Sequence, residues 1–211
     1  MIKFLKKIKN NKPAIVHSDL LSFGRTLENN KKNIIKIFTS HFQKGLFIPS
    51  FSFGSNDLVR YDKFENSMGS LTNICIRDSK FKRTLNPIHS YIYCKYNYNF
   101  NKYKNFSFGN KSIFNFFYKE NFTWVNLGLK KSEGFTIFHH VEDLCDVPYR
   151  KRILLNKKIH IRKTKNYNFN YFARKNKIKY NFSRAVNAML KDKILTQTSL
   201  PNNNKIYFGG C

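Results

Sequence analysis

Short apolar runs alternate with helical segments over the first two thirds of this 211-residue chain. Four runs predict short buried strands: residues 14–16, 46–48, 90–94 and 123–127. Apolar residues recur at helical spacing over 27–42, which ends before Gly45, and a second helix fits 67–76. Strands that alternate with helices predict an α/β fold, a layered sheet with flanking helices.

The composition changes after Pro148–Tyr149. Residues 150–193 hold fifteen Lys or Arg and one acidic residue, Asp192. Here the pattern predicts a hairpin over 153–161 with Asn156 at its middle, and a short helix over 183–195. The run 206–208 has the character of a strand, yet the chain ends three residues later, which suggests a truncated C-terminal portion. We therefore divide the chain into a basic N-terminal extension (1–12), a core (13–150) and a basic C-terminal portion of the same domain (151–211).

The charge balance is strongly basic, with 39 Lys and Arg against 12 Asp and Glu and a formal net charge of +27. Such a charge attracts polyanions and repels polycations. The alternative is compositional drift, because AT-rich codons would enrich Lys, Asn, Ile, Phe and Tyr in core and loops alike. The sequence leaves both interpretations open.

The four cysteines are widely spaced and contain no C-x-x-C pair, so they predict neither a zinc site nor a disulfide framework. Residues 1–12 are basic but precede no apolar segment of the kind a secretory signal has. No run approaches the roughly 18 apolar residues of a membrane span. We expect a cytoplasmic protein that crosses no membrane.

Four short signatures follow one another along the chain. They are Val16-His17-Ser18-Asp19-Leu20-Leu21-Ser22-Phe23-Gly24; Phe47-Ile48-Pro49-Ser50-Phe51-Ser52-Phe53 with Asp57; Met68-Gly69-Ser70-Leu71 through Arg83-Thr84-Leu85-Asn86-Pro87-Ile88-His89-Ser90; and Gly134-Phe135-Thr136-Ile137-Phe138-His139-His140-Val141-Glu142 with Val147-Pro148-Tyr149-Arg150. Each signature alone is weak. Their order over residues 16–150 resembles the aminoglycoside 3-N-acetyltransferase family, also called the antibiotic N-acetyltransferases.

Two matches carry most of this resemblance. Thr136-x-x-His139-x-x-Glu142 is similar to the catalytic T-x-x-H-x-x-E segment of the family, and Phe108-Gly109-x-x-Ser112 is similar to its F-G-x-x-S turn. The resemblance implies an α/β fold unlike that of GCN5-type acetyltransferases. It also implies transfer of an acetyl group from acetyl-CoA to an amine of an amino sugar or aminoglycoside, the reaction that underlies antibiotic resistance.

The resemblance further implies which residues form the site. The catalytic candidates are His139, Glu142 and Asp57, and the cofactor-binding candidates are Ser18, Leu20, Gly24, Ser50, Arg83 and Ser112. Acetyl-CoA is the implied co-substrate, and no metal is implied. A metal site formed by His139, His140 and Glu142 is a poor alternative, because their spacing is not H-E-x-x-H.

The chemistry of His139 supports the same assignment. An amine that attacks a thioester must lose a proton, and histidine, with an ordinary pKa of about 6.5, can accept it at neutral pH. On a helix, His139 and Glu142 share one face, so the carboxylate can orient the imidazole. Thr136 at the N-cap would place His139 in the first turn. The simpler alternative is a buried structural histidine, the role we expect for His140.

The chain departs from the family pattern at two positions. Asn86 stands where members commonly have a histidine before proline, so a protonic role is lost there. Asn73 stands where an acidic residue is expected. The positive charge favours a neutral or anionic amino sugar as acceptor, although an acidic cluster of Asp57, Asp62 and Glu65 would allow an aminoglycoside.

Two rival functions remain. Aromatic residues interleave with Lys and Arg over 167–180, a pattern that suits base stacking with phosphate contacts in a nucleic-acid-binding protein. The chain could also be an inactive relative with a structural role. Nothing in the sequence indicates the oligomeric state.

Overall fold

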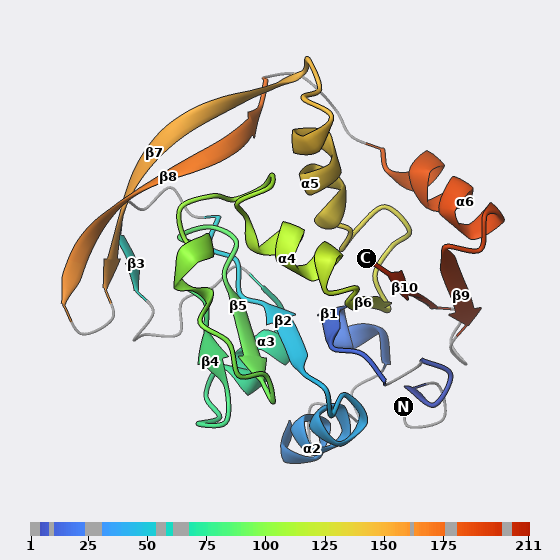
Figure 1. Cartoon of the computed structure of the whole chain (residues 1–211). Coiled ribbons are helices and arrows are strands. Elements are labelled where there is room, and N and C mark those ends of the chain that lie inside the picture. Colours follow the sequence, from blue (N-terminus) through green and yellow to red (C-terminus); the bar gives the residue numbers. More distant parts are fainter. Residues whose placement is uncertain are drawn as a thin grey trace.

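A seven-stranded mixed sheet forms the centre of the molecule in the computed structural model (Figure 1), with the strand order β4-β5-β2-β1-β6-β10-β9. The structure describes residues 5–8, 11–23, 31–53, 58–60, 68–160, 163–175, 181–199 and 204–211. The strands are β1 (Ala14–Ser18), β2 (Leu46–Pro49), β4 (Lys82–Arg83), β5 (Tyr91–Cys94), β6 (Thr123–Leu127), β9 (Leu195–Ser199) and β10 (Lys205–Gly210). β1 lies parallel to β2 and β6, and the other neighbours pair antiparallel.

Helices cover both faces of this sheet (Figure 1). They are α2 (Lys31–His41), α3 (Ser70–Cys75), α4 (Ile113–Lys119), α5 (Ile137–Leu144) and α6 (Ser183–Lys191), with the short 3₁₀ helices η1 (Leu20–Phe23) and η3 (Phe100–Tyr103). Ala14 and Val16 pack with α2 and α3, whereas Ile15, between them on β1, packs with α4. Successive strand residues point to opposite faces, so residues 14–16 of β1 are all apolar because both faces of the strand are covered.

The expected α/β fold, a layered sheet with flanking helices, is therefore confirmed. The four predicted strands correspond to β1, β2, β5 and β6. The predicted helices correspond to α2 and α3, although residues 24–30 and 61–67 lie outside the described part of the chain. None of the described helices is long and apolar enough to cross a membrane.

The predicted hairpin over 153–161 is wrong. One continuous strand, β7 (Arg150–His160), occupies this segment, and it pairs along its whole length with β8 (Thr164–Arg174). Asn156 lies in mid-strand opposite Asn168, and its side-chain amide donates to the Asn168 oxygen at 2.7 Å. The cross-strand partner satisfies the polar side chain that had suggested a turn.

The β7–β8 hairpin forms a curved arm beside the main sheet (Figure 1). β3 (Leu58–Arg60) pairs parallel with β7, and β8 meets the loop before α4, where Ser107 N donates to Asn170 O at 3.0 Å. The arm is thereby attached next to the Phe108–Gly109 turn.

The C-terminal portion completes the main sheet. The predicted strand at 206–208 is part of β10, which lies between β6 and β9. The predicted helix over 183–195 is shorter than expected, because α6 ends at Lys191. Lys193 follows with φ +58, and Ile194 N donates to Met189 O at 2.9 Å. This closing turn is of the Schellman type and directs the chain into β9.

Candidate active site

Helix α5 carries the predicted catalytic pair. His139 lies in its first turn, as expected, with its N–H donating to Thr136 O at 3.0 Å. Thr136 occupies the N-cap position, but its side chain makes no capping hydrogen bond, contrary to our expectation. Thr136 has helical dihedral angles (φ −58, ψ −21), whereas a capping side chain needs an extended backbone to reach the next N–H groups.

His139 and Glu142 are in direct contact. The Nδ1 atom of His139 lies 2.8 Å from Oε2 of Glu142, as the i,i+3 spacing predicted. The carboxylate is buried, and the Tyr149 hydroxyl donates to its Oε1 at 2.9 Å. Arg150 forms an ion pair with it, with Nε 2.8 Å from Oε2. Both carboxylate oxygens are thus held, and Glu142 is a rigid partner for the imidazole.

The surroundings of His139 favour its neutral form. Burial lowers its pKa below 6.5, the hydrogen bond that His139 donates to Glu142 opposes this shift, and the positive charge of Arg150 adds to it. The ring centroids of Phe108 and Phe182 lie 5.7 and 5.3 Å from the centroid of the imidazole. An imidazole that is neutral at pH 7 can accept a proton.

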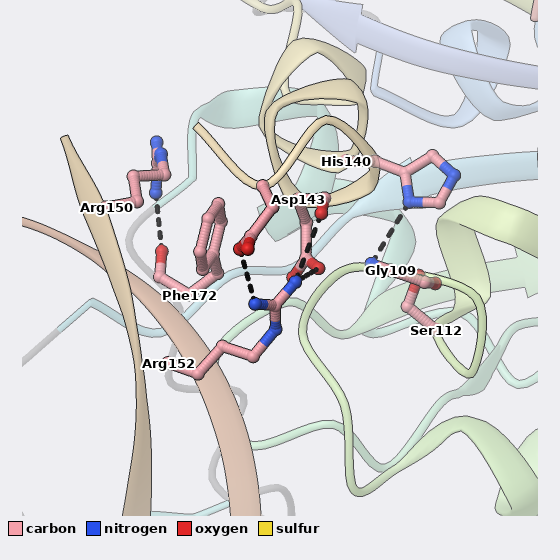
Figure 2. A network of polar contacts seen from close by, with 8 residues as sticks. Gly109, Ser112, His140, Asp143, Arg150, Arg152 and Phe172 are labelled. Carbon is pink, nitrogen blue, oxygen red and sulfur yellow. Dashed lines mark hydrogen bonds and ion pairs between the residues drawn. The ribbon is translucent and has the colours of Figure 1, made fainter. Parts of the chain in front are cut away.

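A second network fixes α5 against its neighbours (Figure 2). His140 is buried, and its Nδ1 accepts the Gly109 N–H at 3.2 Å. Arg152 on β7 forms ion pairs with Asp143 at 2.9 Å and with Asp146 at 2.6 Å. These contacts hold the helix to the turn before α4 on one side and to the arm on the other. Sequence reasoning gave Tyr149, Arg150 and Arg152 no role, although the first two ended the fourth signature.

The family model for aminoglycoside 3-N-acetyltransferase matches residues 15–209. The chain belongs to this family. It is therefore an acyltransferase. No curated protein sequence matches the chain.

Solved structures share the fold. AAC-IIIb, in a binary complex with CoASH, has a TM-score of 0.80 at 14% identity, over 99% of this chain and 89% of that chain. The YokD protein from Bacillus subtilis has a TM-score of 0.76 at 16% identity, over 99% and 85%. An AAC(3)-IVa mutant in complex with gentamicin has a TM-score of 0.74 at 14% identity, over 99% and 80%.

Three of the cofactor-binding candidates that the aminoglycoside 3-N-acetyltransferase resemblance implied lie at the ends of β1 and β2. Ser18 ends β1 and is half-buried, and Leu20 follows in η1 with its side chain in the core. Ser50 directly follows β2, and its buried hydroxyl has no hydrogen-bond partner among the described residues. In open α/β sheets, ligands bind at the carboxyl ends of parallel strands.

The Arg83 side chain also lies at the carboxyl end of β2. Its Nη2 donates to Ser50 O at 2.9 Å, and its Nε donates to the Ser90 hydroxyl at 3.1 Å. Ser112 lies elsewhere, as the N-cap of α4, where its buried hydroxyl donates to Gly109 O at 2.7 Å. Gly24 and Asp57 lie outside the described residues. The cofactor roles of Ser18, Leu20, Gly24, Ser50, Arg83 and Ser112 remain predictions.

Asn86, which stands where the resemblance implied a histidine, is held by hydrogen bonds to backbone groups. Its side-chain oxygen accepts the N–H groups of Ile88 and His89, at 3.1 and 2.8 Å. Its amide donates to Lys104 O and Phe106 O, at 3.1 and 3.2 Å. The side chain is buried, and these four hydrogen bonds to backbone groups join the 86–89 segment to the 104–106 loop.

Proposed function

We propose that this protein transfers an acetyl group from acetyl-CoA to an amine of an amino sugar or aminoglycoside, with His139 as the general base. The contact of 2.8 Å between His139 Nδ1 and Glu142 Oε2, within a T-x-x-H-x-x-E segment, carries the proposal. The amine nitrogen forms a bond to the thioester carbonyl carbon, and Nε2 of His139 takes the proton that the amine loses. The carbon–sulfur bond then breaks, and the sulfur leaves with a proton as free CoA.

Glu142 assists as the partner of His139. When Nε2 takes up a proton, the imidazole becomes positive, and the carboxylate stabilises it through Nδ1–H. General bases of this kind typically contribute about 10²- to 10⁴-fold to the rate. Asp57 is proposed as a third catalytic residue that helps to hold the acceptor amine.

Acetyl-CoA is supported as donor by the CoASH complex of the similar AAC-IIIb. In this chain, Ser18 ends β1, Ser50 directly follows β2, and Arg83 provides a positive charge next to Ser50; Gly24 is proposed to join them from its place in the first signature. These groups suit the amide and phosphate oxygens of CoA. The Ser50 hydroxyl has no hydrogen-bond partner among the residues that the structure describes, and a bound ligand would supply one.

Two aromatic residues of the segment that suggested nucleic-acid binding are not available for stacking. Phe169 and Phe172, two aromatic residues of the interleaved segment, are buried at 0% and 2% exposure. Buried rings cannot stack on bases. We therefore do not propose a nucleic-acid partner.

The test is release of free CoA thiol from acetyl-CoA over a panel of amines, with wild type, His139→Ala and His160→Ala. His160 lies at the far end of β7 and serves as the matched control. We expect His139→Ala to lower kcat at least ~100-fold with CoA binding retained, because the base acts in the transition state. The control should keep wild-type turnover. Near-normal turnover of His139→Ala would refute His139 as the base.

A further inference from the structure

Arg150 is the most constrained charged residue of the site. It begins β7, its side chain is 3% exposed, and its guanidinium contacts three different groups. Nη1 donates to Phe172 O on β8 at 2.5 Å, and Nε lies 2.8 Å from Oε2 of Glu142. Nη2 lies 2.7 Å from Nδ1 of His139. One side chain therefore connects the catalytic pair on α5 with the arm.

The contact with His139 conflicts with the contact that Glu142 makes. The same Nδ1 atom lies 2.8 Å from Glu142 Oε2, which can only accept a proton, and 2.7 Å from Arg150 Nη2, which can only donate one. A neutral imidazole carries one N–H. Nδ1 can therefore satisfy Glu142 or Arg150, but not both at once.

The two possibilities differ in their chemistry. If Nδ1 carries the hydrogen and donates to Glu142, the lone pair is on Nε2, and the imidazole can act as a base at that atom. If Nδ1 accepts from Arg150, the hydrogen is on Nε2, and the imidazole cannot take a proton there. Glu142 stabilises the first tautomer and Arg150 the second.

We propose that Arg150 is a positioning residue that competes with Glu142 for Nδ1 of His139 and so controls the tautomer and the basicity of the general base. This inference rests on the proposed function of His139. When Nε2 takes the amine proton, both ring nitrogens carry hydrogen, so the contact with Arg150 becomes repulsive while that with Glu142 strengthens. Arg150 thus destabilises the charged imidazole and favours transfer of its Nε2 proton to the departing CoA sulfur, which restores the neutral base.

The charges around His139 determine whether replacement of Arg150 raises or lowers the pKa of His139. Glu142 on the same helix raises the pKa of His139, whereas Arg150 on β7 and Arg174 on β8 lower it. His89 also interacts with His139, but burial holds the pKa of His89 well below 6.5, so it is neutral at pH 7. Removal of the Arg150 charge leaves Glu142 less compensated and should raise the pKa of His139.

The experiment is nitrogen NMR of histidine-labelled full-length protein over a pH titration, because the chemical shifts of Nδ1 and Nε2 report the tautomer and the pKa. The signal of His139 is assigned with His139→Ala. We expect Arg150→Met to raise the pKa of His139 by about one unit or more and to shift the neutral form toward the Nδ1–H tautomer. In the pH profile of kcat/KM, the acidic limb should move to higher pH by the same amount.

Arg152→Met is the matched control. Arg152 lies two residues further along β7 and pairs with Asp143 and Asp146, not with the catalytic pair. This variant should leave both the tautomer and the pKa of His139 unchanged. If Arg150→Met has no more effect on His139 than the control, Arg150 is only a structural counter-ion of Glu142 and the inference is wrong.

Two further variants cover the case in which Arg150→Met does not fold. Arg150→Lys keeps the charge but lacks the planar fork that reaches three groups, so the Nδ1–H tautomer should gain population. The double variant Arg150→Met with Glu142→Gln removes both buried charges, and the pKa of His139 should return toward the wild-type value. An unchanged tautomer in the first variant or a pKa still raised in the second would contradict the inference.

The NMR readout does not depend on turnover. Wild-type protein that fails to acetylate any amine would refute the proposed function, whereas wild-type protein that is active with an unchanged His139 in Arg150→Met would refute only the role of Arg150.

Discussion

The Nδ1 atom of His140 accepts the backbone N–H of Gly109 at 3.2 Å, which ties α5 to the turn at the start of α4. Gly109 has φ +79, and a Cβ there would lie 2.9 Å from Oδ1 of Asp143 on the same helix. Glycine therefore permits both the turn and its close approach to α5. The two adjacent histidines therefore have different roles. His139 contacts Glu142, and His140 fixes the helix on which His139 and Glu142 lie.

We predict that acid weakens the fold through buried histidines. Burial lowers the pKa of His140 to about 4 and that of His17 to about 3. The unfolded chain binds these protons near pH 6.5, so between pH 6.5 and 4 it holds more protons than the folded chain. The free energy of unfolding should therefore fall as pH is lowered through this window, by at most about 1.4 kcal/mol per pH unit and histidine.

Urea denaturation at pH 7.5, 6.5, 5.5 and 4.5 measures this slope. His140→Asn retains an acceptor for the Gly109 N–H but does not titrate, so its slope should be smaller than that of wild type. His160→Asn, near the tip of the arm, serves as control and should keep the wild-type slope. A slope that His140→Asn leaves unchanged would contradict the prediction.

We predict that acetyl transfer persists below pH 6.5. The pKa of His139 is lowered, chiefly by burial, so the base stays neutral at pH values where an ordinary histidine is protonated. Glu142→Gln removes the group that raises this pKa and should move the acidic limb of kcat/KM further down. It should also lower kcat, but less than His139→Ala does. Both proteins are assayed with the same acceptor over the same pH range. The titration of the acceptor amine affects both equally, so it cancels in the ratio of variant to wild-type kcat/KM. An acidic limb that rises in Glu142→Gln would show that another group governs the profile.

We predict that Asn86→Ala destabilises the protein by about 2–4 kcal/mol, because several buried backbone groups lose their partners. Asn86→His, which introduces the residue that the resemblance led us to expect, should also destabilise, since a neutral imidazole cannot accept two and donate two hydrogen bonds. Urea denaturation measures both. Asn97→Ala, at an exposed position, is the control and should change stability by less than about 0.5 kcal/mol. Wild-type stability of Asn86→Ala would show that water replaces these contacts.

We predict that the acceptor is a neutral or anionic amino sugar. The net charge of +27 repels a polycationic aminoglycoside at a distance and attracts an anion. Near the catalytic pair, Glu142 is paired with Arg150, and Asp143 and Asp146 share Arg152, so each of these three carboxylates is engaged in an ion pair. Catalytic efficiency for nucleotide-linked amino sugars should exceed that for kanamycin-type amines, and high salt should improve use of the latter. A better antibiotic substrate without a salt effect would contradict this interpretation of the charge.

Local pattern was sufficient for much of the fold and for the centre of the site. The apolar run at 46–48 predicted β2, because a short strand covered on both faces tends to be apolar at every position. The contact between His139 and Glu142 followed from i,i+3 spacing, because helix geometry alone brings such side chains together. Each of these conclusions depends on residues that are close in sequence.

Only the tertiary structure decided what distant segments bring together. Asn156 suggested a turn by residue type, but β8 offers Asn168 as a cross-strand partner, and β7 continues through this position without a turn. In the sequence, Asn86 indicated only that a protonic group was lost. The structure shows that its buried side-chain amide donates hydrogen bonds to the 104–106 loop. Arg150 contacts Phe172, 22 residues away in the chain, and thereby reaches Nδ1 of His139 in competition with Glu142. Sequence spacing specifies neighbours on one helix or strand, whereas the partner of a buried polar group depends on which segments the packing of the core places beside it.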